Sequence, residues 1–398
     1  MDKVAAGLNP AAPTTPVLAQ EGYWRFRRRA VFWRPPDRGP PGGWFWEEGL
    51  RPGDESEPPW LPLIRFRLVP HMDNRRRSLS GVRVTGRYHI GNYLGAGINY
   101  VRLQDDYESY IFVADYHTMT TKPNARDFTD DLYDMVIDLI AIGLDPERTV
   151  IYRQSRIPEV AELALLLAMV TPLSWVQRVP TFKEKVREQP ENVNLGLLEY
   201  PVLMTADILM PKAEVVPVGR DQAAHLELTR EITRRFNRTY GDVFPVPQIV
   251  LNAEIPLVKG TDGKTKMSKS LNNIIGVTDP PEAIRKQVLS MVTDVKRTYK
   301  TQPGHPRSCN VCAFYRFLFD DWEHYWDLCR TAKIGCHEKK QILAERIIER
   351  FQPFRERRAE LSPAIVRSIL DAGGERAHEV ARGTMAEVRQ AVGLPASR

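Results

Sequence analysis

The chain has 398 residues, of which 42% are hydrophobic, so it can bury a sizeable core and should form about two or three domains. It contains no run of about 18 apolar residues and no signal-peptide pattern at its N-terminus, which argues against a membrane protein and predicts a cytoplasmic one. The net charge of +6 suits a polyanionic partner, but many proteins that never bind nucleic acid carry a similar excess.

The first 71 residues differ in composition from everything that follows. They hold 12 of the 31 prolines and five of the eight tryptophans, and they sustain no helical or strand periodicity. Because paired prolines remove backbone donors and interrupt regular elements, we expect this extension to be mostly disordered. The alternative is that translation naturally begins at Met72, just before the first predicted strand, and the sequence leaves both open.

From residue 78 the apolar pattern alternates between short strands and amphipathic helices, which is typical of an α/β fold with parallel strands and crossover helices. We predict strands at residues 78–82, 110–114, 149–152 and 214–218, and helices at 94–106, 128–142, 158–169, 200–209 and 221–236. Beyond residue 276 the strand signals stop, and the apolar spacing predicts that the chain continues as helices only.

A glycine-rich turn follows the first predicted strand. Three glycines between Ser80 and Asn92 precede a helix whose N-terminal amides can face an anion, because glycine lets a ligand approach the backbone closely. The side chains of His89 and Asn92 could donate to phosphate oxygens there. The pattern matches neither Gly-x-Gly-x-x-Gly nor a Walker string, which disfavours the common nucleotide-binding folds. The plainer alternative is a tight turn with a capping asparagine.

A second candidate phosphate site lies far along the chain, in Lys266-Met267-Ser268-Lys269-Ser270. The turn-forming residues 260–265 precede it, so the loop can move with its ligand. Its two lysines could close on a triphosphate and stabilise the charge that grows on a leaving pyrophosphate. The alternative is a solvated surface loop.

Two strings, His89-Ile90-Gly91-Asn92 at the end of the glycine-rich turn and Lys266-Met267-Ser268-Lys269-Ser270, resemble in this order the HIGH and KMSKS signatures of class I aminoacyl-tRNA synthetases. The chain is similar to the tryptophanyl-tRNA synthetases over nearly all of residues 78–398. This resemblance implies a Rossmann-like parallel sheet as a catalytic domain over residues 72–275, and an all-helical anticodon-binding domain over residues 276–398. It also implies L-tryptophan, ATP with Mg²⁺ and tRNA(Trp) as ligands, and a homodimer. We expect neither a membrane nor DNA as a partner.

Residues 200–207 resemble the specificity helix of this family, which would place Tyr200, Met204 and Asp207 on one helix face. The resemblance implies that Met204 packs on the indole ring and that the Asp207 carboxylate accepts the indole N–H. We expect this carboxylate to have no other partner, so phenylalanine would be rejected because the buried charge would stay unpaired. Tyrosyl enzymes usually carry glutamine where Met204 stands, which favours tryptophan. Alternatively, Met204 is core filler and Asp207 a helix-surface residue.

The remaining site residues are carried over from the same resemblance. His117 and Gln222 would line the tryptophan pocket, although His117 could equally be a structural histidine. Arg83 stands where many members carry glutamine, and it adds a cation beside the ATP site. The implied catalytic residues are His89, Lys183, Lys266 and Lys269. The implied ATP-binding residues are Arg83, Thr85, Gly91, Asn92, Gly219, Arg220, Asp221, Ile255, Lys266, Met267, Ser268, Lys269 and Ser270.

All four cysteines, Cys309, Cys312, Cys329 and Cys336, fall within 28 residues of the predicted helical region. Such clustering in a cytosolic protein suggests a metal site rather than disulfides. Some tryptophanyl enzymes carry a four-cysteine [4Fe-4S] site near this place, but their last ligand would fall at Lys339 here, so a cluster would need altered ligation. Zinc with His337 is a second possibility, and four unrelated reduced thiols are a third.

The resemblance also implies the reaction. The tryptophan carboxylate would attack the ATP α-phosphorus, and a terminal tRNA hydroxyl would then take the aminoacyl group, with basic stretches at residues 296–307 and 355–358 holding tRNA phosphates. A rival from another class is a non-catalytic synthetase-like protein that binds RNA or protein, and a lesser rival is a tyrosyl-tRNA synthetase. The intact second string and Asp207 argue against the first rival.

Overall fold

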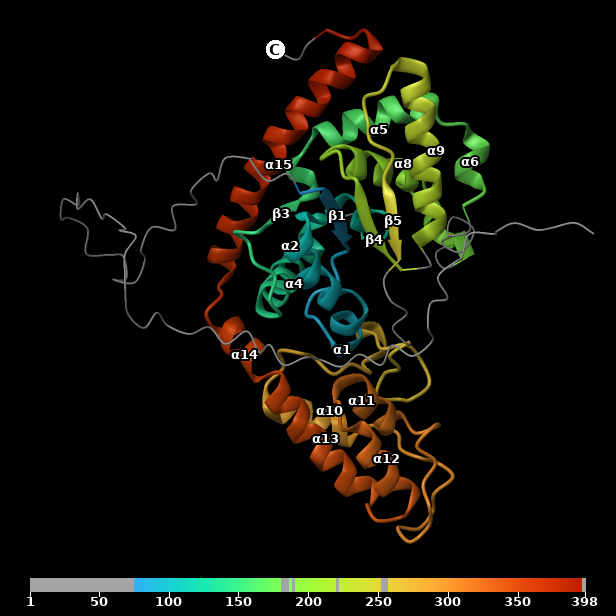
Figure 1. The fold of residues 1–398 in the computed structure, drawn as a ribbon, viewed down its shortest axis with the longest axis vertical. Coiled ribbons are helices and arrows are strands. Elements are labelled where there is room, and N and C mark those ends of the chain that lie inside the picture. The colour runs from blue at the N-terminus through green and yellow to red at the C-terminus, as the bar shows by residue number, and fades with distance from the viewer. Residues whose placement is uncertain are drawn as a thin grey trace, which may run out of the picture.

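The computed structural model describes residues 75–122, 124–179, 186–187, 190–219, 222–251 and 257–395. Several of our expectations lie outside these ranges, namely the extension over residues 1–71 with its alternative start at Met72, and the site residues Lys183, Arg220, Asp221 and Ile255. The described residues form a parallel sheet flanked by helices, with a further group of helices at one end of it (Figure 1).

In the described chain, five parallel strands form one sheet in the order β3-β2-β1-β4-β5. The register pairs Ile111 of β2 with Ser80 of β1 and with Ile151 of β3. Side chains alternate between two cores, because Ile111 and Ile151 face one side of the sheet while Tyr110 and Val150 face the other. The four predicted strands are confirmed, whereas β5 is not among our predictions. The strands are β1 (Arg77–Val82), β2 (Glu108–Val113), β3 (Thr149–Arg153), β4 (Val215–Val218) and β5 (Gln248–Leu251).

Helices connect the strands, as parallel pairing requires. After β1, α1 (Ile90–Asn92) passes through a π-helical turn (Tyr93–Gly97) into α2 (Ile98–Asp106). The predicted helix at residues 200–209 begins earlier, at Leu195, because the Asn194 side chain accepts the N–H of Leu197 at 3.2 Å. The others are α3 (Asp115–Met119), α4 (Thr129–Ala141), α5 (Glu159–Val170), α6 (Leu173–Gln177), α8 (Leu195–Leu209) and α9 (Ala223–Tyr240), with 3-10 turns at Ala125–Phe128, Gln154–Arg156, Pro190–Asn192 and Lys269–Leu271.

The strand order reverses between β1 and β4. The chain steps outward from β1 to β2 and β3, and then returns to place β4 on the other side of β1. In open parallel sheets, a crevice forms at the carboxyl ends of the two strands where the order reverses, and ligands bind there. The turns after β1 and β4 therefore flank the expected binding site.

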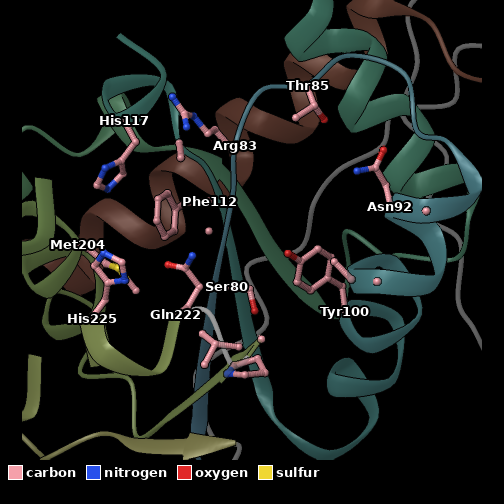
Figure 2. A pocket seen from close by; sticks show the side chains of 18 of the residues that line it. Ser80, Arg83, Thr85, Asn92, Tyr100, Phe112, His117, Met204, Gln222 and His225 are labelled. Atoms are coloured by element: carbon pink, nitrogen blue, oxygen red, sulfur yellow. The ribbon is translucent and has the colours of Figure 1, made fainter. Parts of the chain in front are cut away.

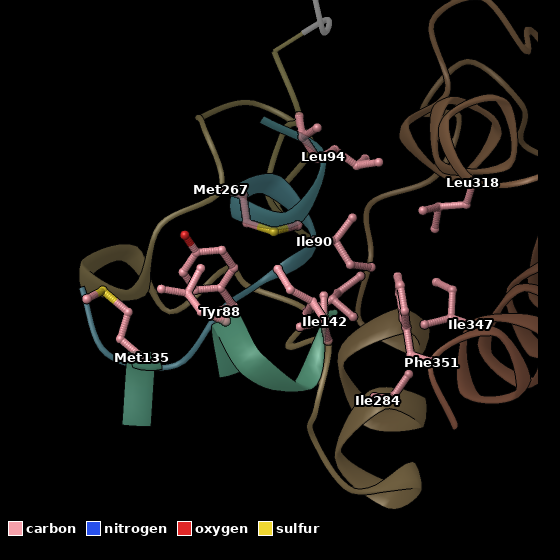
Figure 3. Packing of buried hydrophobic residues seen from close by; sticks show 14 of the residues in the cluster. Tyr88, Ile90, Leu94, Met135, Ile142, Met267, Ile284, Leu318, Ile347 and Phe351 are labelled. Atoms are coloured by element: carbon pink, nitrogen blue, oxygen red, sulfur yellow. The ribbon is translucent and has the colours of Figure 1, made fainter. Parts of the chain in front are cut away.

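Beyond residue 276 the described chain is helical, as predicted. Ile90 and Met267, one from each predicted nucleotide-binding string, share a core with Ile284, Ile347 and Phe351 of this helical region (Figure 3). The two strings therefore rest on packing that the helical region supplies. Its helices are α10 (Pro281–Leu289), α11 (Asn310–Leu318), α12 (Trp322–Arg330), α13 (Cys336–Arg350), α14 (Gln352–Ala359) and α15 (Pro363–Val392).

The last helix, α15, runs back along the sheet and covers its edge strand β3 (Figure 1). A Cβ built on Gly373 would lie 1.9 Å from the carbonyl oxygen of Ile151, so only glycine allows this approach. Covering an edge strand with a helix blocks unwanted strand pairing. The division into two domains at residue 276 remains a prediction. Although α15 has 30 residues, neither it nor any other helix in the described ranges is long and apolar enough to cross a membrane.

Candidate active site

A cleft of ≈ 1420 Å³ opens at the carboxyl ends of β1 and β4. Arg83 and Thr85 line it from the turn after β1, and Gly219 lines it from the turn after β4. His117 enters from α3, which follows β2. The cleft therefore lies where the strand order reverses, as the topology requires.

Those predicted substrate and catalytic residues that the structure describes gather in this one cleft. In Figure 2, His117 and Met204 lie at one end of it beside His225, and Asn92 lies at the other end beside Tyr100. His117 and Met204 belong to the predicted tryptophan pocket, and Asn92 belongs to the predicted phosphate site. The predicted residues that line the cleft are Arg83, Thr85, His89, Gly91, Asn92, His117, Tyr200, Met204, Asp207, Gly219, Gln222, Lys266, Met267, Ser268, Lys269 and Ser270.

His89 is held in one tautomer by the start of its own helix. Its Nδ1 accepts the backbone N–H of Asn92 at 3.1 Å, so Nε2 carries the proton and is the donor. Burial, together with the charges of Lys269 and Lys266, lowers the pKa of His89 to about 4. The imidazole is therefore neutral at physiological pH, and it can donate Nε2–H to a phosphate oxygen.

The second string sits on a short hairpin and is fixed at its centre. Lys266 pairs across the hairpin with Lys259, and the N–H of Met267 donates to the carbonyl oxygen of Val258 at 3.0 Å. Met267 is buried in the core, whereas Lys266 is exposed. This anchoring leaves the cations on either side of Met267 facing the cleft.

The first string is also joined to the segment that follows the second string. The N–H of Ile90 donates to the carbonyl oxygen of Ile275 at 2.9 Å, and the N–H of Val277 donates to that of Tyr88 at 3.1 Å. These backbone bonds place the second loop beside the first over a separation of about 175 residues in sequence, as an enclosing triphosphate site requires.

Lys269 points back toward the turn after β1. A Cβ built on Gly86 would lie 2.4 Å from Lys269 Nζ and 2.3 Å from Asp131 Oδ1, so both charged groups crowd a position that has no side chain. Gly86 has φ +66°, which glycine adopts without strain. Burial lowers the pKa of Lys269, and the nearby Asp131 carboxylate opposes that shift. The Asp131 carboxylate, which also pairs with Lys122 at 3.6 Å, therefore favours the charged form of Lys269 beside the predicted phosphate site.

The Asp207 carboxylate is buried and already paired, which corrects our expectation that it has no other partner. Its Oδ2 lies 2.9 Å from Nε2 of His117, and Nε2 of Gln154 donates to both of its oxygens, at 2.8 and 2.9 Å. A carboxylate this deeply buried needs such donors because removing its charge from water is costly. Burial raises the pKa of Asp207, while the bonds from His117 and Gln154 lower it.

Gln154 and His225 complete this end of the site and are missing from our prediction. Gln154 directly follows β3, and the carboxyl ends of parallel strands meet at one edge, so its position after a predicted strand is the available signal. Nε2 of His225 lies 2.6 Å from the Tyr200 hydroxyl, and His225 is in the first turn of α9, three residues after the N-cap residue Gln222. Met204 lines the cleft and also packs against the core.

Three of the four cysteines are buried around a lysine. Cys309, Cys312 and Cys329 lie in the core with Lys339, whereas Cys336 is only half-buried at the start of α13. Nζ of Lys339 lies 2.9 Å from Sγ of Cys312 and 3.1 Å from Sγ of Cys329. In the described ranges no group of three or more His, Cys, Asp or Glu side chains is arranged to hold a metal ion. These residues do not fit a four-sulfur cluster, because an ammonium stands beside the sulfurs.

Comparison with known proteins decides the family. Residues 72–352 match the family of tRNA synthetases class I (W and Y). The tryptophan–tRNA ligase of Thermotoga maritima is 43% identical over 331 residues, which cover 80% of this chain and 99% of that protein. The chain belongs to the tryptophan–tRNA ligases. The ligase of Deinococcus radiodurans, 42% identical over 327 residues, is likewise matched over 80% of this chain and 98% of its own length.

A solved structure of this ligase family shares the fold. The tryptophanyl-tRNA synthetase of Campylobacter jejuni, complexed with ADP and tryptophan, superimposes with a TM-score of 0.73 at 32% identity, covering 80% of this chain and 100% of that one. Membership of the tryptophan–tRNA ligases confirms our predictions of a class I synthetase fold and of an aminoacyl-tRNA ligase. It also decides for tryptophan over tyrosine and against a non-catalytic protein.

Proposed function

We propose that this cleft performs both steps of tryptophan–tRNA ligation, with the indole at the Asp207 end and the ATP phosphates at the Asn92 end. In the first step, the tryptophan carboxylate attacks the ATP α-phosphorus and pyrophosphate leaves. In the second, a terminal ribose hydroxyl of tRNA(Trp) takes the aminoacyl group and AMP leaves. The observation that carries the proposal is that His89 and Lys269 line the same cleft as the buried carboxylate of Asp207.

At the phosphate end, the side chains would act by charge and position. Phosphoryl transfer needs stabilisation of the phosphate oxygens rather than covalent participation by the protein. His89 would donate from Nε2, and Lys266 and Lys269 would balance the charge that grows on the departing pyrophosphate. The attacking carboxylate is already ionised, so this step needs no general base. Lys183, Arg220, Asp221 and Ile255 keep the roles that the family resemblance implies.

Magnesium would arrive with ATP rather than at a dedicated protein site. Mg²⁺ prefers oxygen ligands and commonly takes them from substrate phosphates and one or two carboxylates. The described residues offer no cluster of three or more metal-binding side chains. When bound, the ion would neutralise phosphate charge, and the hydroxyls of Ser268 and Ser270, 3.0 Å apart, would remain available to the phosphates.

At the indole end, one acceptor position of Asp207 would define the substrate. A carboxylate offers about four lone-pair sites, and the contacts from His117 and Gln154 leave room for one more donor. The indole N–H would fill it, while phenylalanine brings no donor to a carboxylate that has lost its water. Discrimination would therefore depend on where the remaining acceptor lies, rather than on an unpaired charge.

Amino-acid-dependent exchange of pyrophosphate into ATP tests the activation step. The full chain should catalyse exchange with tryptophan and not with tyrosine or phenylalanine. The Asp207→Ala variant should lose about a hundredfold or more of that rate, because it removes the acceptor. Asp294→Asn is the matched control, since Asp294 is a buried carboxylate that also pairs with a histidine, His305 at 2.9 Å, away from the cleft. Undiminished exchange in Asp207→Ala would sink the pocket assignment.

We also propose that the helical region binds tRNA(Trp) and reads its anticodon. Lys296, Lys300 and Arg307 are exposed on the segment between α10 and α11. The stretch at residues 355–358 is less suited than we expected, because Arg358 is paired with two carboxylates. Removing Lys296 and Lys300 together should reduce the salt slope of tRNA binding by about 2, and Arg382→Ala on the exposed side of α15 is the control. An unchanged slope would count against this surface.

Finally, we propose a cytoplasmic homodimer. Leu165 and Met169 lie one turn apart on α5 and are 55% and 70% exposed, and Leu173 of α6 is 60% exposed beside them in sequence. Large apolar side chains grouped in this way often mark an interface. Sedimentation should show a dimer for the full chain and a monomer for Leu165→Asp with Met169→Asp. A dimer that survives both changes would place the interface elsewhere.

A further inference from the structure

Lys339 of α13 is fully buried, which is rare for a lysine without a counter-charge. Its Nζ contacts Sγ of Cys312 on α11 at 2.9 Å and Sγ of Cys329 on α12 at 3.1 Å. No carboxylate in the described ranges forms an ion pair with this ammonium. The backbone of Lys339 has its own partners, since its N–H donates to the carbonyl oxygen of Gly335 and its carbonyl oxygen accepts the Tyr315 hydroxyl. Whatever balances this ammonium must therefore come from sulfur.

A third sulfur belongs to the same group. Cys309 belongs to the same buried core as Cys312 and Cys329, so three thiols and one amine are packed out of water. An ammonium in such a place is very costly unless a negative charge lies beside it, and a thiolate beside it gains a charge-assisted hydrogen bond. One thiolate shared among the three sulfurs makes the group neutral overall.

The surroundings favour the same charge distribution. The hydrogen bond from Cys312 and the charge of Lys339 hold the pKa of Cys329 below its ordinary value. Burial lowers the pKa of Lys339, but the three sulfurs outweigh burial and leave that pKa raised. Arg297 also lowers the pKa of Cys329, and the half-buried Lys340 adds a further positive charge. These cations favour a thiolate over a neutral thiol.

We propose that Lys339 and one thiolate of the Cys309, Cys312 and Cys329 group form a metal-free ion pair that joins α11, α12 and α13. The ammonium takes the position in which a metal ion would hold the sulfurs, and a second cation there would be repelled. His337 is exposed on α13 and takes no part. This inference does not depend on the catalytic assignment, because the group lies outside the cleft.

Thiolate absorbance in the ultraviolet, followed against pH in the full chain under reducing conditions, tests the charge state. About one thiolate per chain should be present at neutral pH. The signal should disappear in Lys339→Met, and it should persist in Lys340→Met, which removes the neighbouring lysine whose Nζ donates to the carbonyl oxygen of Leu289. If Lys339→Met does not fold, the thiolate absorbance of the native chain is the test. The absence of a thiolate from the native chain at neutral pH overturns the proposal.

Metal content tests the alternative, in which the cysteines bind a metal ion. The full chain is incubated anaerobically with Zn²⁺ alone, and separately with Fe²⁺ and sulfide, and is then dialysed and analysed for metal. The native chain should retain no more metal than Cys312→Ser. One zinc per chain, or an iron–sulfur absorption band, that is lost in Cys312→Ser would overturn the ion pair in favour of a metal centre.

Discussion

Arg358 of α14 reaches Asp138 of α4 with Nη1 at 2.5 Å from Oδ1, and its Nη2 lies 2.5 Å from Oδ1 of Asp134. Asp138 also accepts the Thr278 hydroxyl at 2.6 Å and the N–H of Tyr88 at 2.7 Å. One buried carboxylate therefore joins the turn before the first string, the segment after the second string, and the helix that leads into α15. Burial raises the pKa of Asp138, and Arg358 opposes that rise.

Removing this carboxylate should be costly. Asp138→Ala should lower the free energy of unfolding by about 3–5 kcal/mol, because it leaves Arg358 without its buried partner. Urea denaturation measures the change. Asp321→Ala is the matched control, since Asp321 forms a two-bond pair with Arg346 at the surface, at 2.7 and 3.0 Å. That variant should lose about 1 kcal/mol or less. Equal losses of unfolding free energy in the two variants would mean that the burial of Asp138 does not make its ion pair more important for stability than the surface pair.

The lowered pKa of His89 makes stability depend on pH. Its pKa is about 4 in the folded chain against 6.5 when unfolded, so the unfolded chain binds the extra proton first. The contribution of neutral His89 to the free energy of unfolding is complete above pH 6.5. It is lost as the pH falls toward 4, which lowers the free energy of unfolding by up to about 3 kcal/mol. His89→Gln should remove this part of the pH dependence in urea titrations, while His324→Gln, at an exposed position on α12, should retain it. A slope unchanged by His89→Gln would contradict the assignment.

Gln154 should act on tryptophan through Asp207. Gln154→Leu removes the donors to both carboxylate oxygens, and a lost hydrogen bond to a buried charge costs about 1–3 kcal/mol. We expect kcat/KM for tryptophan in pyrophosphate exchange to fall about tenfold to a hundredfold, with its acid limb moved to higher pH because the pKa of Asp207 rises further. The control is Gln104→Leu, a buried glutamine that bonds Gly143 and Asp145 away from the cleft.

The outcome for Gln104→Leu separates two explanations. Loss of its hydrogen bonds should lower stability without changing the pH profile of exchange. If both variants shift the pH profile of exchange by the same amount, the effect of Gln154→Leu would come from a general change in folding. It would then not come from the lost contact between Gln154 and Asp207.

Local patterns predict most elements of this fold, but not their long-range contacts. The continuous apolar run of β2 identifies a buried strand, since every residue of it is buried. By contrast, β5 has only four residues among prolines and gives little periodicity. The glycine-rich turn and the lysine loop could be assigned to one site because their residue types suit phosphate.

The partners of buried charges are harder to predict. Asp207 pairs with Gln154 and His117, which lie 53 and 90 positions away in the sequence. No local sequence pattern predicts such distant partners. The partners of Lys339 could not be predicted locally either, because the two sulfurs lie 10 and 27 positions earlier, on other helices. Only the packing of whole elements decides such pairs, and that packing depends on contacts throughout the chain.

Two glycines of α15 should respond in opposite directions. Gly373→Ala would place a Cβ against the carbonyl oxygen of Ile151, at 1.9 Å before relaxation, and should cost about 1–3 kcal/mol of stability or more. Gly383→Ala meets no atom within 4 Å and should add up to about 1 kcal/mol, because alanine favours a helix interior. Thermal unfolding of both variants checks this. Two losses of equal size would show that α15 does not depend on close approach to β3.

The position of α15 has a consequence for the order in which the protein is made. Ala377, Ala381, Met385 and Val388 belong to the same core as Tyr152 of β3, although α15 is the last helix of the chain. During synthesis the ribosome releases the N-terminal part first, and that part can fold only as far as its partners exist. One edge of the sheet therefore stays uncovered until α15 has emerged, so the core on the α15 side of β3 cannot be completed while only the residues before α15 are outside the ribosome.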